Sequence, residues 1–409
     1  MKTISKLGRL SFLVALAWGL APAAHGAVFV QCPGDTDGDA KWSSAGETQP
    51  SNTHCMHVSG GDGFVKMADG YLQYIFGFSD LTGIPPAQAM DAGMLAANFP
   101  APTIALKQGQ EFYLTLTNAG MVNRPDLFDP HTVHFHGFPQ AAPVFDGMPE
   151  GSIGINMGAS ITYYYNLVEP GTFMYHCHME ATEHMQMGML GNLYVSPIQN
   201  GTALPDPDGS GRIHTSFVYN DVDGSTGYDV EVPIQLGSFD PAFHDASMTV
   251  QPLPFADMKD KYAMMNGRGY PDTVNPNWLT PIANPVTEPD PGKVSQKVSS
   301  VVTATAGQKV LLRLSNLSVT NFYTVTALGF PMKVVGSGAH ILRGPDGKDL
   351  YFDTNSVTLG GGEAADVIID TRDVPVGTYF LYSTNLNYLS NNTEDYGGMM
   401  TEIVIAAAN

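Results

Sequence analysis

Short runs in which apolar and polar residues alternate recur along most of the chain, and they predict β-strands. Clear examples are EFYLTLTN at residues 111–118 and ITYYYNLV at 161–168. Gly, Pro and Asn separate these runs, as is typical of β-sandwich proteins, and no long amphipathic helix is evident. The pattern therefore predicts an all-β fold from about residue 64 onward.

The strand-rich region is duplicated. Four segments of the first half recur in the same order in the second half, at offsets that lie close together: 198, 192, 206 and 210 residues. An ordered set of matches of this kind indicates one fold present twice. The matching pairs are KQGQEFYLTLTN (107–118) with TAGQKVLLRLSN (305–316), HFHGFP (134–139) with TALGFP (326–331), GTFMYHCH (171–178) with GTYFLYST (377–384), and GML (188–190) with GMM (398–400).

The start of the chain has the pattern of an export signal. Basic residues precede an apolar run at 11–21, and the small residues APAAHGA follow, so cleavage is expected near Gly26 or Ala27. A membrane anchor is the alternative, but the run is short for a span and no later stretch is longer. A periplasmic or secreted protein without a membrane span is expected. The predicted parts are a signal peptide (1–27), an irregular N-terminal arm (28–60), a first domain (61–199), a linker (200–213) and a second domain (214–409).

Charge and cysteine content narrow the function. With 19 Lys and Arg against 39 Asp and Glu, the formal net charge is -20, which argues against nucleic acid as a partner and permits a cationic one. Of the three cysteines, Cys32 and Cys55 flank one early loop and are expected to form a disulfide in an oxidising compartment. Cys177 remains single.

Six of the 12 histidines gather in two short segments, and this clustering predicts metal binding. Because side chains alternate along a strand, Cys177 should point away from His176 and His178, and His131 away from His134 and His136. One group would then contain Cys177 with His131, and His184 and Met189 in the following loop could join it. The other group is four histidines. The candidate ligands are His131, His134, His136, His176, Cys177, His178, His184 and Met189.

Two imidazoles, a thiolate and a thioether are the ligands of a blue-copper, or type 1, electron-transfer site. Zinc is the alternative for this set, although it rarely recruits methionine. The four-histidine group could hold one copper, form half of a larger cluster, or be an unfilled remnant.

Three further features could bind metal. Asp35, Asp37 and Asp39 resemble a calcium loop, but the Gly and Glu that such a loop needs are missing, so a solvated loop is favoured over calcium binding. His54 and His57 could supply missing copper ligands, but a pair of loop residues near the disulfide is favoured. The methionines around Cys177 favour core packing over copper storage, except Met189; the others are Met174, Met179, Met185 and Met187.

At these motifs the chain resembles the multicopper oxidases and related cupredoxins, including two-domain laccase-like proteins and copper nitrite reductases. The resemblance covers roughly residues 60–407 and implies two tandem cupredoxin-like Greek-key β-sandwich domains. It implies type 1 copper on His131, Cys177, His184 and Met189. It further implies that His134 matches a type 2 ligand and that His136, His176 and His178 match type 3 ligands.

The second repeat departs from the family pattern. None of its positions equivalent to the histidine and cysteine ligands of the first repeat holds a histidine or a cysteine. No further H-x-H pair is present in the sequence. An eight-histidine trinuclear cluster is therefore not expected within one chain or a homo-oligomer. The equivalent residues are Tyr323, Thr326, Leu328, Tyr382, Ser383 and Thr384. A partner chain could supply the missing histidines, and two-domain members of the family are commonly trimers.

Three functions remain open from the sequence. The first is a copper oxidoreductase, in which electrons from a small-molecule or protein donor pass through His-Cys-His to a second copper that reduces O2 or another small acceptor. The second is an electron carrier that uses only type 1 copper, and the third is a periplasmic copper-binding or tolerance protein.

Overall fold

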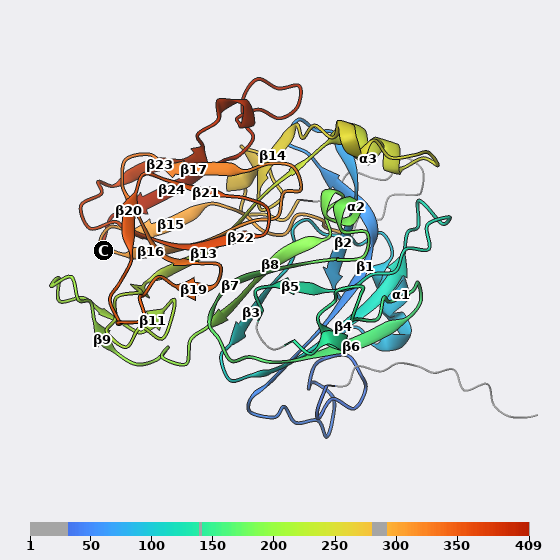
Figure 1. The fold of residues 1–409 in the computed structure, drawn as a ribbon, viewed down its shortest axis with the longest axis horizontal. Helices are drawn as coiled ribbons and strands as arrows, with labels where there is room; N and C mark the ends of the chain where they lie inside the picture. The colour runs from blue at the N-terminus through green and yellow to red at the C-terminus, as the bar shows by residue number, and fades with distance from the viewer. Residues whose placement is uncertain (1–31, 139–140, 280–292, 409) are drawn as a thin grey trace, which may run out of the picture.

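The computed structural model describes residues 32–138, 141–279 and 293–408, which form two β-sandwich lobes (Figure 1). The predicted signal peptide and the first residues of the predicted arm lie outside the described residues. Within the described part, the α-helices are short: α1 (Ala89–Gly93), α2 (Ala181–Gln186) and α3 (Pro241–Ser247). None of the helices there is long and apolar enough to cross a membrane. The predicted all-β fold is confirmed.

The first domain consists of two four-stranded sheets that enclose an aromatic-rich core. Phe112, Phe135 and Tyr175 are buried between them, because alternate side chains of each strand point inward. The first sheet has the order β2 (Leu72–Asp80), β1 (Thr53–Lys66), β4 (Glu111–Gly120), β6 (Ser160–Asn166). The second has the order β3 (Ala101–Lys107), β8 (Leu190–Ser196), β7 (Gly171–His176), β5 (His134–His136).

The second domain repeats this plan with an aliphatic core that includes Ile234, Leu312 and Val325. One sheet has the order β14 (Tyr262–Met265), β13 (Val230–Phe239), β16 (Lys309–Asn316), β22 (Glu363–Asp370), β18 (Met332–Ser337), β19 (His340–Ile341), and β20 (Phe352–Thr354) also pairs with β18. The other has the order β15 (Val302–Thr305), β24 (Met400–Ala406), β23 (Gly377–Ser383), β17 (Tyr323–Ala327), β21 (Ser356–Leu359).

Strand register supports the duplication inferred from the sequence. His134 pairs with His176 in the first domain, and the equivalent Thr326 pairs with Tyr382 in the second. The amide of Cys177 donates to the carbonyl of Met189 at 3.0 Å, and the amide of Ser383 donates to that of Met399 at the same distance. The two domains therefore share backbone geometry even where their side chains differ completely.

The predicted irregular arm at 28–60 is wrong at its end, from Thr53 onward. Residues 53–60 belong to β1, which pairs in parallel with β4 and antiparallel with β2. The Ser-Gly-Gly-Asp-Gly segment suggested a loop because glycine disfavours strands. Here glycine is required by close approach, since a Cβ on Gly60 would lie 2.7 Å from His131 Cδ2.

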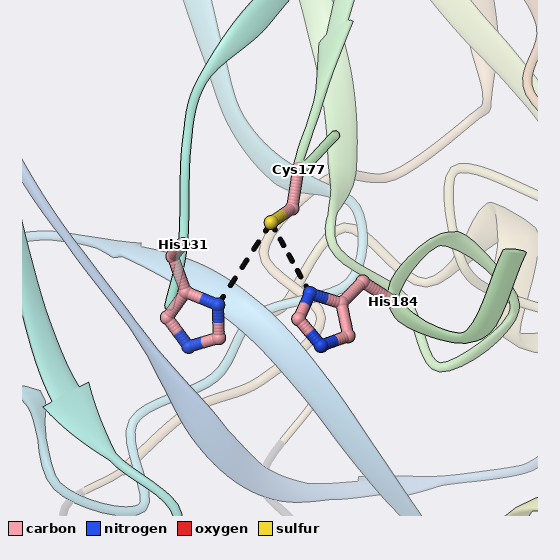
Figure 2. A group of neighbouring side chains, drawn as sticks. All are labelled: His131, Cys177 and His184. Atoms are coloured by element: carbon pink, nitrogen blue, oxygen red, sulfur yellow. Dashed lines mark hydrogen bonds between the residues drawn. The ribbon is translucent and has the colours of Figure 1, made fainter. Parts of the chain in front are cut away.

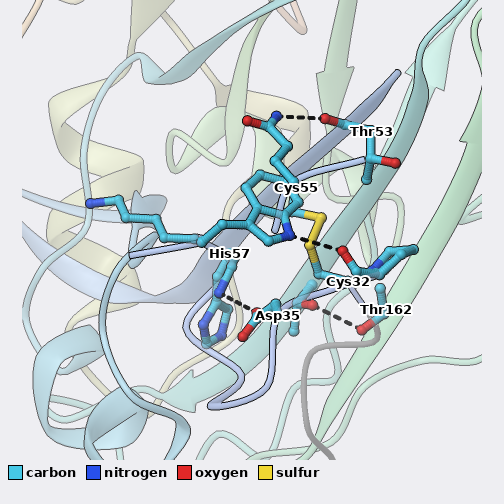
Figure 3. Close-up of a disulfide and its surroundings, with 12 residues drawn as sticks. Cys32, Asp35, Thr53, Cys55, His57 and Thr162 are labelled. Carbon is cyan, nitrogen blue, oxygen red and sulfur yellow. Dashed lines mark hydrogen bonds between the residues drawn. A yellow bond between two sulfur atoms is a disulfide. The ribbon is translucent and has the colours of Figure 1, made fainter. Parts of the chain in front are cut away.

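The arm before β1 is fixed to the first domain by the predicted disulfide, which is confirmed. Cys32 and Cys55 are bonded across a separation of 23 residues (Figure 3). Trp42 packs against the pair and its indole N–H donates to Pro33 O at 2.8 Å. Residues 32–52 are therefore held against the first domain, although they form no helix or strand.

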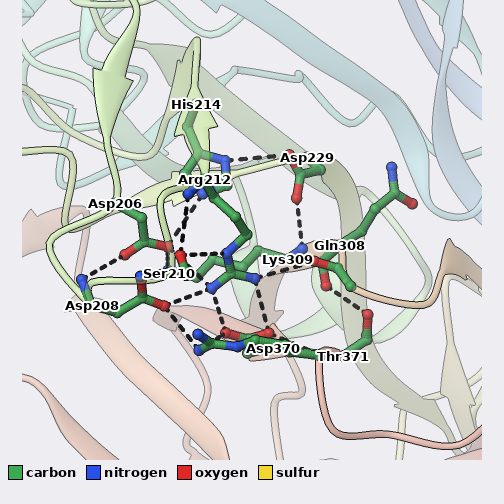
Figure 4. A network of polar contacts seen from close by, with 12 residues as sticks. Asp206, Asp208, Ser210, Arg212, His214, Asp229, Gln308, Lys309, Asp370 and Thr371 are labelled. Carbon is green, nitrogen blue, oxygen red and sulfur yellow. Dashed lines mark hydrogen bonds and ion pairs between the residues drawn. The ribbon is translucent and has the colours of Figure 1, made fainter.

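The predicted linker, 200–213, is bound to the second domain along its length. Within and just after it, β9 (Leu204–Pro205) pairs with β10 (Ile213–His214), and β11 (Ser216–Phe217) then pairs with β12 (Gly227–Tyr228). Arg212 forms ion pairs with Asp206, Asp208 and Asp370 (Figure 4). A segment with these contacts is a fixed connection and not a free tether.

Buried polar contacts join strands β7 and β8 of the first domain to strand β16 of the second domain. Arg313 of β16 is fully buried, and its Nη1 donates to Thr172 Oγ1 of β7 at 2.9 Å. Ser315 Oγ donates to Asn192 Oδ1 of β8 at 2.5 Å. Because an unpaired buried guanidinium is costly, Asp366 and Glu231 pair with Arg313 from the second domain itself. The strand that ends at His176 is thus packed directly on the second domain.

Candidate metal centre

Two antiparallel strand ends bring the candidate ligands together. Strands β5 and β7 pair His134 with His176, and the chain then continues from β7 through Cys177 and His178 into α2. Because Cys177 follows directly after His176, it points to the opposite face of the sheet. The two groups predicted from the sequence therefore lie on opposite sides of one backbone segment.

The first group surrounds the sulfur of Cys177. His184 Nδ1 lies 3.2 Å and His131 Nδ1 lies 3.8 Å from Cys177 Sγ (Figure 2). All three side chains are fully buried, and their ligand atoms lie within 4.8 Å of one another. Two ring nitrogens aimed at one buried sulfur form a donor set that suits a copper ion.

Met189 lies beside this group. Its side chain is fully buried, and its methyl group and the His131 ring both lie over Gly60, where an added Cβ would be 3.2 Å from Met189 Cε. The carbonyl of Met189 accepts from the Cys177 amide, so the loop after α2 folds back onto the cysteine. The sequence predicts that His184 and Met189, in the segment after Cys177, join the cysteine, and this loop conformation agrees with that prediction.

The Cys177 thiol and the His184 imidazole shift each other's pKa. Burial alone would raise the pKa of the Cys177 thiol, but the adjacent imidazoles of His184 and His131 outweigh burial and lower it. Burial lowers the pKa of His184, and the Cys177 sulfur and Asp129 outweigh it and raise that pKa. The thiolate is the form that binds a metal, so the geometry favours the ligand state of the cysteine.

The second group consists of four imidazoles on the other side of the backbone. The rings of His134, His136, His176 and His178 have centroid separations of 4.8 to 5.5 Å between contacting pairs. His136 Nε2 lies 3.0 Å from His176 Nε2. Burial lowers the pKa of His176 to about 3, so its ring is a neutral potential ligand. His178 Nδ1 is buried without a hydrogen-bond partner.

The second domain contributes no histidine to this group in the described part of the chain. Its Gly361 and Gly362 and residues 318–322 face the histidines across a cavity of about 440 Å³. Gly362 O lies 3.4 Å from His136 Nδ1, and a Cβ at Gly362 would come within 3.0 Å of that ring. At this contact, the second domain thus presents backbone atoms of Gly362 to His136 and no metal-binding side chain.

The positions of the second domain equivalent to the copper ligands have the predicted substitutions. Tyr323 and Ser383 are buried where the first domain has His131 and Cys177, so hydroxyl groups stand in place of an imidazole and a thiol. Leu328 is exposed. Tyr323 and Ser383, together with Met399 of the GMM segment, do not match the donor set of type 1 copper.

The remaining sequence candidates lie apart from these two groups. His57 Nε2 contacts Thr117 Oγ1 at 2.8 Å, and the His54 ring packs on Phe112. Asp35, Asp37 and Asp39 do converge within 4.8 Å, but Asp35 already accepts from two backbone amides. The solvated loop favoured from the sequence stays a prediction.

Sequence reasoning missed two residues at the first group. Asp129 Oδ2 lies 3.7 Å from His184 Nε2, and a carboxylate oxygen of Glu180 lies within 4.8 Å of the same two residues. The position of Asp129, two residues before His131, offered a signal, because metal-bound histidines commonly pair with a carboxylate. Nothing in the sequence pattern singled out Glu180.

Comparison with known proteins matches this fold and site. A family model described as multicopper oxidase matches residues 84–200, and a second model with the same description matches residues 246–405. Together they cover most of the chain, and both of the candidate ligand segments lie within the first. The chain belongs to the multicopper oxidase and cupredoxin superfamily, a copper-binding family.

Two relatives illustrate the similarity in sequence. Laccase-5 of Arabidopsis thaliana is 24% identical over 310 residues, which are 75% of this chain and 43% of the laccase. The L-ascorbate oxidase of Cucurbita pepo var. melopepo is 34% identical over 107 residues, which are 25% of this chain and 17% of that protein. The chain thus spans less than half the length of the curated relatives it matches.

Solved structures share the fold at low identity. The blue copper oxidase of Nitrosomonas europaea has a TM-score of 0.62 and 19% identity, over 86% of each chain. The copper nitrite reductase of the same organism has a TM-score of 0.56 and 15% identity, over 87% of this chain and 94% of that one. These likenesses support the two-domain architecture.

Proposed function

We propose that this protein is an exported copper-dependent oxidoreductase with two distinct copper sites in its first domain. His131, Cys177, His184 and Met189 would hold type 1 copper, and His134, His136, His176 and His178 would hold the second copper. The observation that carries the proposal is the buried Cys177 sulfur, which faces two Nδ1 atoms and is flanked in sequence by two histidines of the other group.

Copper, when bound, supplies reversible one-electron redox chemistry. The chain contributes geometry. Full burial of Cys177 excludes water from the first group, and the His176-Cys177-His178 backbone connects the two groups by the shortest covalent route. His136, His176 and His178 line the cavity, where a small acceptor such as O2 can approach. The donor could be a small molecule or a redox protein, and the acidic surface favours a cationic one.

The missing half of a trinuclear cluster is the main constraint on the proposal. Thr326, Leu328 and Tyr382 occupy the second-domain positions that would carry histidines, so a further copy of this chain would not complete the cluster. This favours as a second candidate an electron carrier that uses only type 1 copper. A different partner chain with two H-x-H pairs would restore the full cluster.

Two substitutions test the proposal. Cys177→Ser should abolish the intense visible absorption of the thiolate–copper bond, whereas His136→Ala should retain that absorption and lose O2 reduction. Survival of the blue colour in Cys177→Ser would refute the type 1 assignment. Unchanged oxidase activity in His136→Ala would refute a catalytic role of the four-histidine group, whereas a blue unchanged protein without oxidase activity would favour the electron carrier. His340→Ala, at an exposed histidine of the second domain, is the matched control.

A further inference from the structure

The cavity beside the four histidines has the size of a small-molecule site. Its volume of about 440 Å³ lies in the range of roughly 300–1,000 Å³ that is typical of such sites. Histidines form one wall, α2 forms the second, and the second domain forms the third.

The lining outside the histidines is uncharged. Among the described residues that surround the cavity, there is no Asp, Glu, Lys or Arg side chain. Apolar groups alternate with neutral hydrogen-bonding groups, which suits a molecule that has both. The apolar members are Ala181, Met185, Val319 and Phe322, and the polar ones are Thr182, Ser318, Thr320 and Asn321.

Hydrogen bonds and close packing hold the wall that the second domain contributes to the cavity. Asp260 accepts hydrogen bonds from Thr320 Oγ1 and from Asn321 Nδ2, the latter at 3.0 Å. The Ser318 amide donates to Asn316 Oδ1 at 2.8 Å. Gly360 leaves room for the ring of Phe322, because a Cβ there would lie 2.6 Å from Phe322 Cε1.

We propose that this cavity binds an uncharged, partly apolar organic molecule, held against His136, His176 and His178 of the four-histidine group. An ion would lose its hydration there without a counter-charge from the lining, whereas a neutral molecule would bury its apolar part and hydrogen-bond to the hydroxyl and amide groups. Its position beside a second copper rests on the proposed function, but the cavity itself does not.

The binding test uses two probes of similar shape, benzyl alcohol and benzoate, and the metal-free protein. Ligand-detected NMR titration should show that benzyl alcohol binds at least tenfold more tightly than benzoate. Val319→Trp, which fills the cavity from its half-buried wall, should weaken benzyl alcohol binding at least tenfold. Val376→Trp is the matched control at a 60% exposed valine outside the lining and should change binding less than twofold.

The copper-loaded protein tests the position of the ligand. Benzyl alcohol should alter the electron paramagnetic resonance signal of the non-blue copper and leave the blue absorption unchanged, and Val319→Trp should abolish the alteration. Equal binding of both probes, or equal binding to Val319→Trp and the unchanged protein, would overturn the cavity assignment. Binding to the metal-free protein combined with the absence of a non-blue copper signal would refute the second copper and leave the cavity intact.

Discussion

The immediate neighbours of Cys177 favour the thiolate form of its side chain. Two Nδ1 atoms lie 3.2 and 3.8 Å from its sulfur, and the buried Met189 is the proposed source of a weakly binding thioether. The axial ligand tunes the reduction potential of a blue-copper site, and the thiolate gives it its colour. Colour and potential should therefore respond to different residues.

Met189→Leu tests this separation. The substitution removes the thioether but preserves apolar volume, so the blue absorption should persist while the reduction potential rises, because the oxidised copper loses a donor. Potentiometric titration followed in the visible spectrum measures both. Met187→Leu, at another fully buried methionine two residues away, should leave the potential unchanged. Equal shifts in the two variants would show that Met189 is only packing.

A second residue-scale prediction concerns His57, a buried histidine outside both groups. Burial lowers its pKa to about 4. Because the unfolded chain binds the proton near pH 6.5 and the folded chain only near pH 4, the unfolded state gains protons first as the pH falls. The free energy of unfolding should therefore decrease across this window, by up to about 3 kcal/mol from this group alone.

Chemical denaturation of the metal-free protein at pH 7 and pH 4 measures the effect. His57→Gln should lose less stability between these two values than the unchanged protein does. The exposed His340→Gln should behave like the unchanged protein. If His57→Gln retained the full loss, the acid sensitivity would lie elsewhere.

At the scale of elements, helix α2 is held from the second domain. The carbonyl oxygen of Gln186, two residues after His184, lies 2.9 Å from His244 Nε2 of α3. The side-chain amide of Gln186 donates to Asp260 Oδ1 at 3.1 Å. Asp260 also binds Thr320 and Asn321 of the cavity wall. The second domain thus holds both α2 and the cavity wall, although its described residues add no histidine to either group.

His244→Ala should loosen this attachment. We expect faster amide hydrogen exchange across residues 181–189 and faster loss of the blue copper to a chelator, because His184 and Met189 lie in this segment. Exchange in β16, distant from the substitution, serves as the internal reference. Unchanged exchange at 181–189 would mean that α2 is held by the first domain alone.

Elements also differ in how far the sequence predicts them. Strands β4 and β6 follow from alternation, and the two ligand groups follow from the period of two along β5 and β7. Strand β1 was missed in part, because its glycines are required by contacts with His131 and Gly120 that only the folded chain contains. The roles of Asp129 and Gln186 depend on tertiary contacts in the same way.

At the scale of the whole molecule, two copies of one fold have taken different roles. The duplication and the loss of ligands from the second copy were predicted from repeat offsets, and paired register in β5–β7 and β17–β23 supports the alignment. The sequence could not predict that the second domain would form a cavity wall, because segments 318–322 and 361–362 meet His136 only through domain packing.

The copper content per chain of the fully loaded, dialysed protein tests the central claim most directly. The account predicts about two copper ions per chain, one that requires Cys177 and one that requires His136. Removal of one ion by Cys177→Ser and of the other by His136→Ala would assign each to its group. A single copper in the unchanged protein would contradict the second site, and four would contradict the absence of a trinuclear cluster.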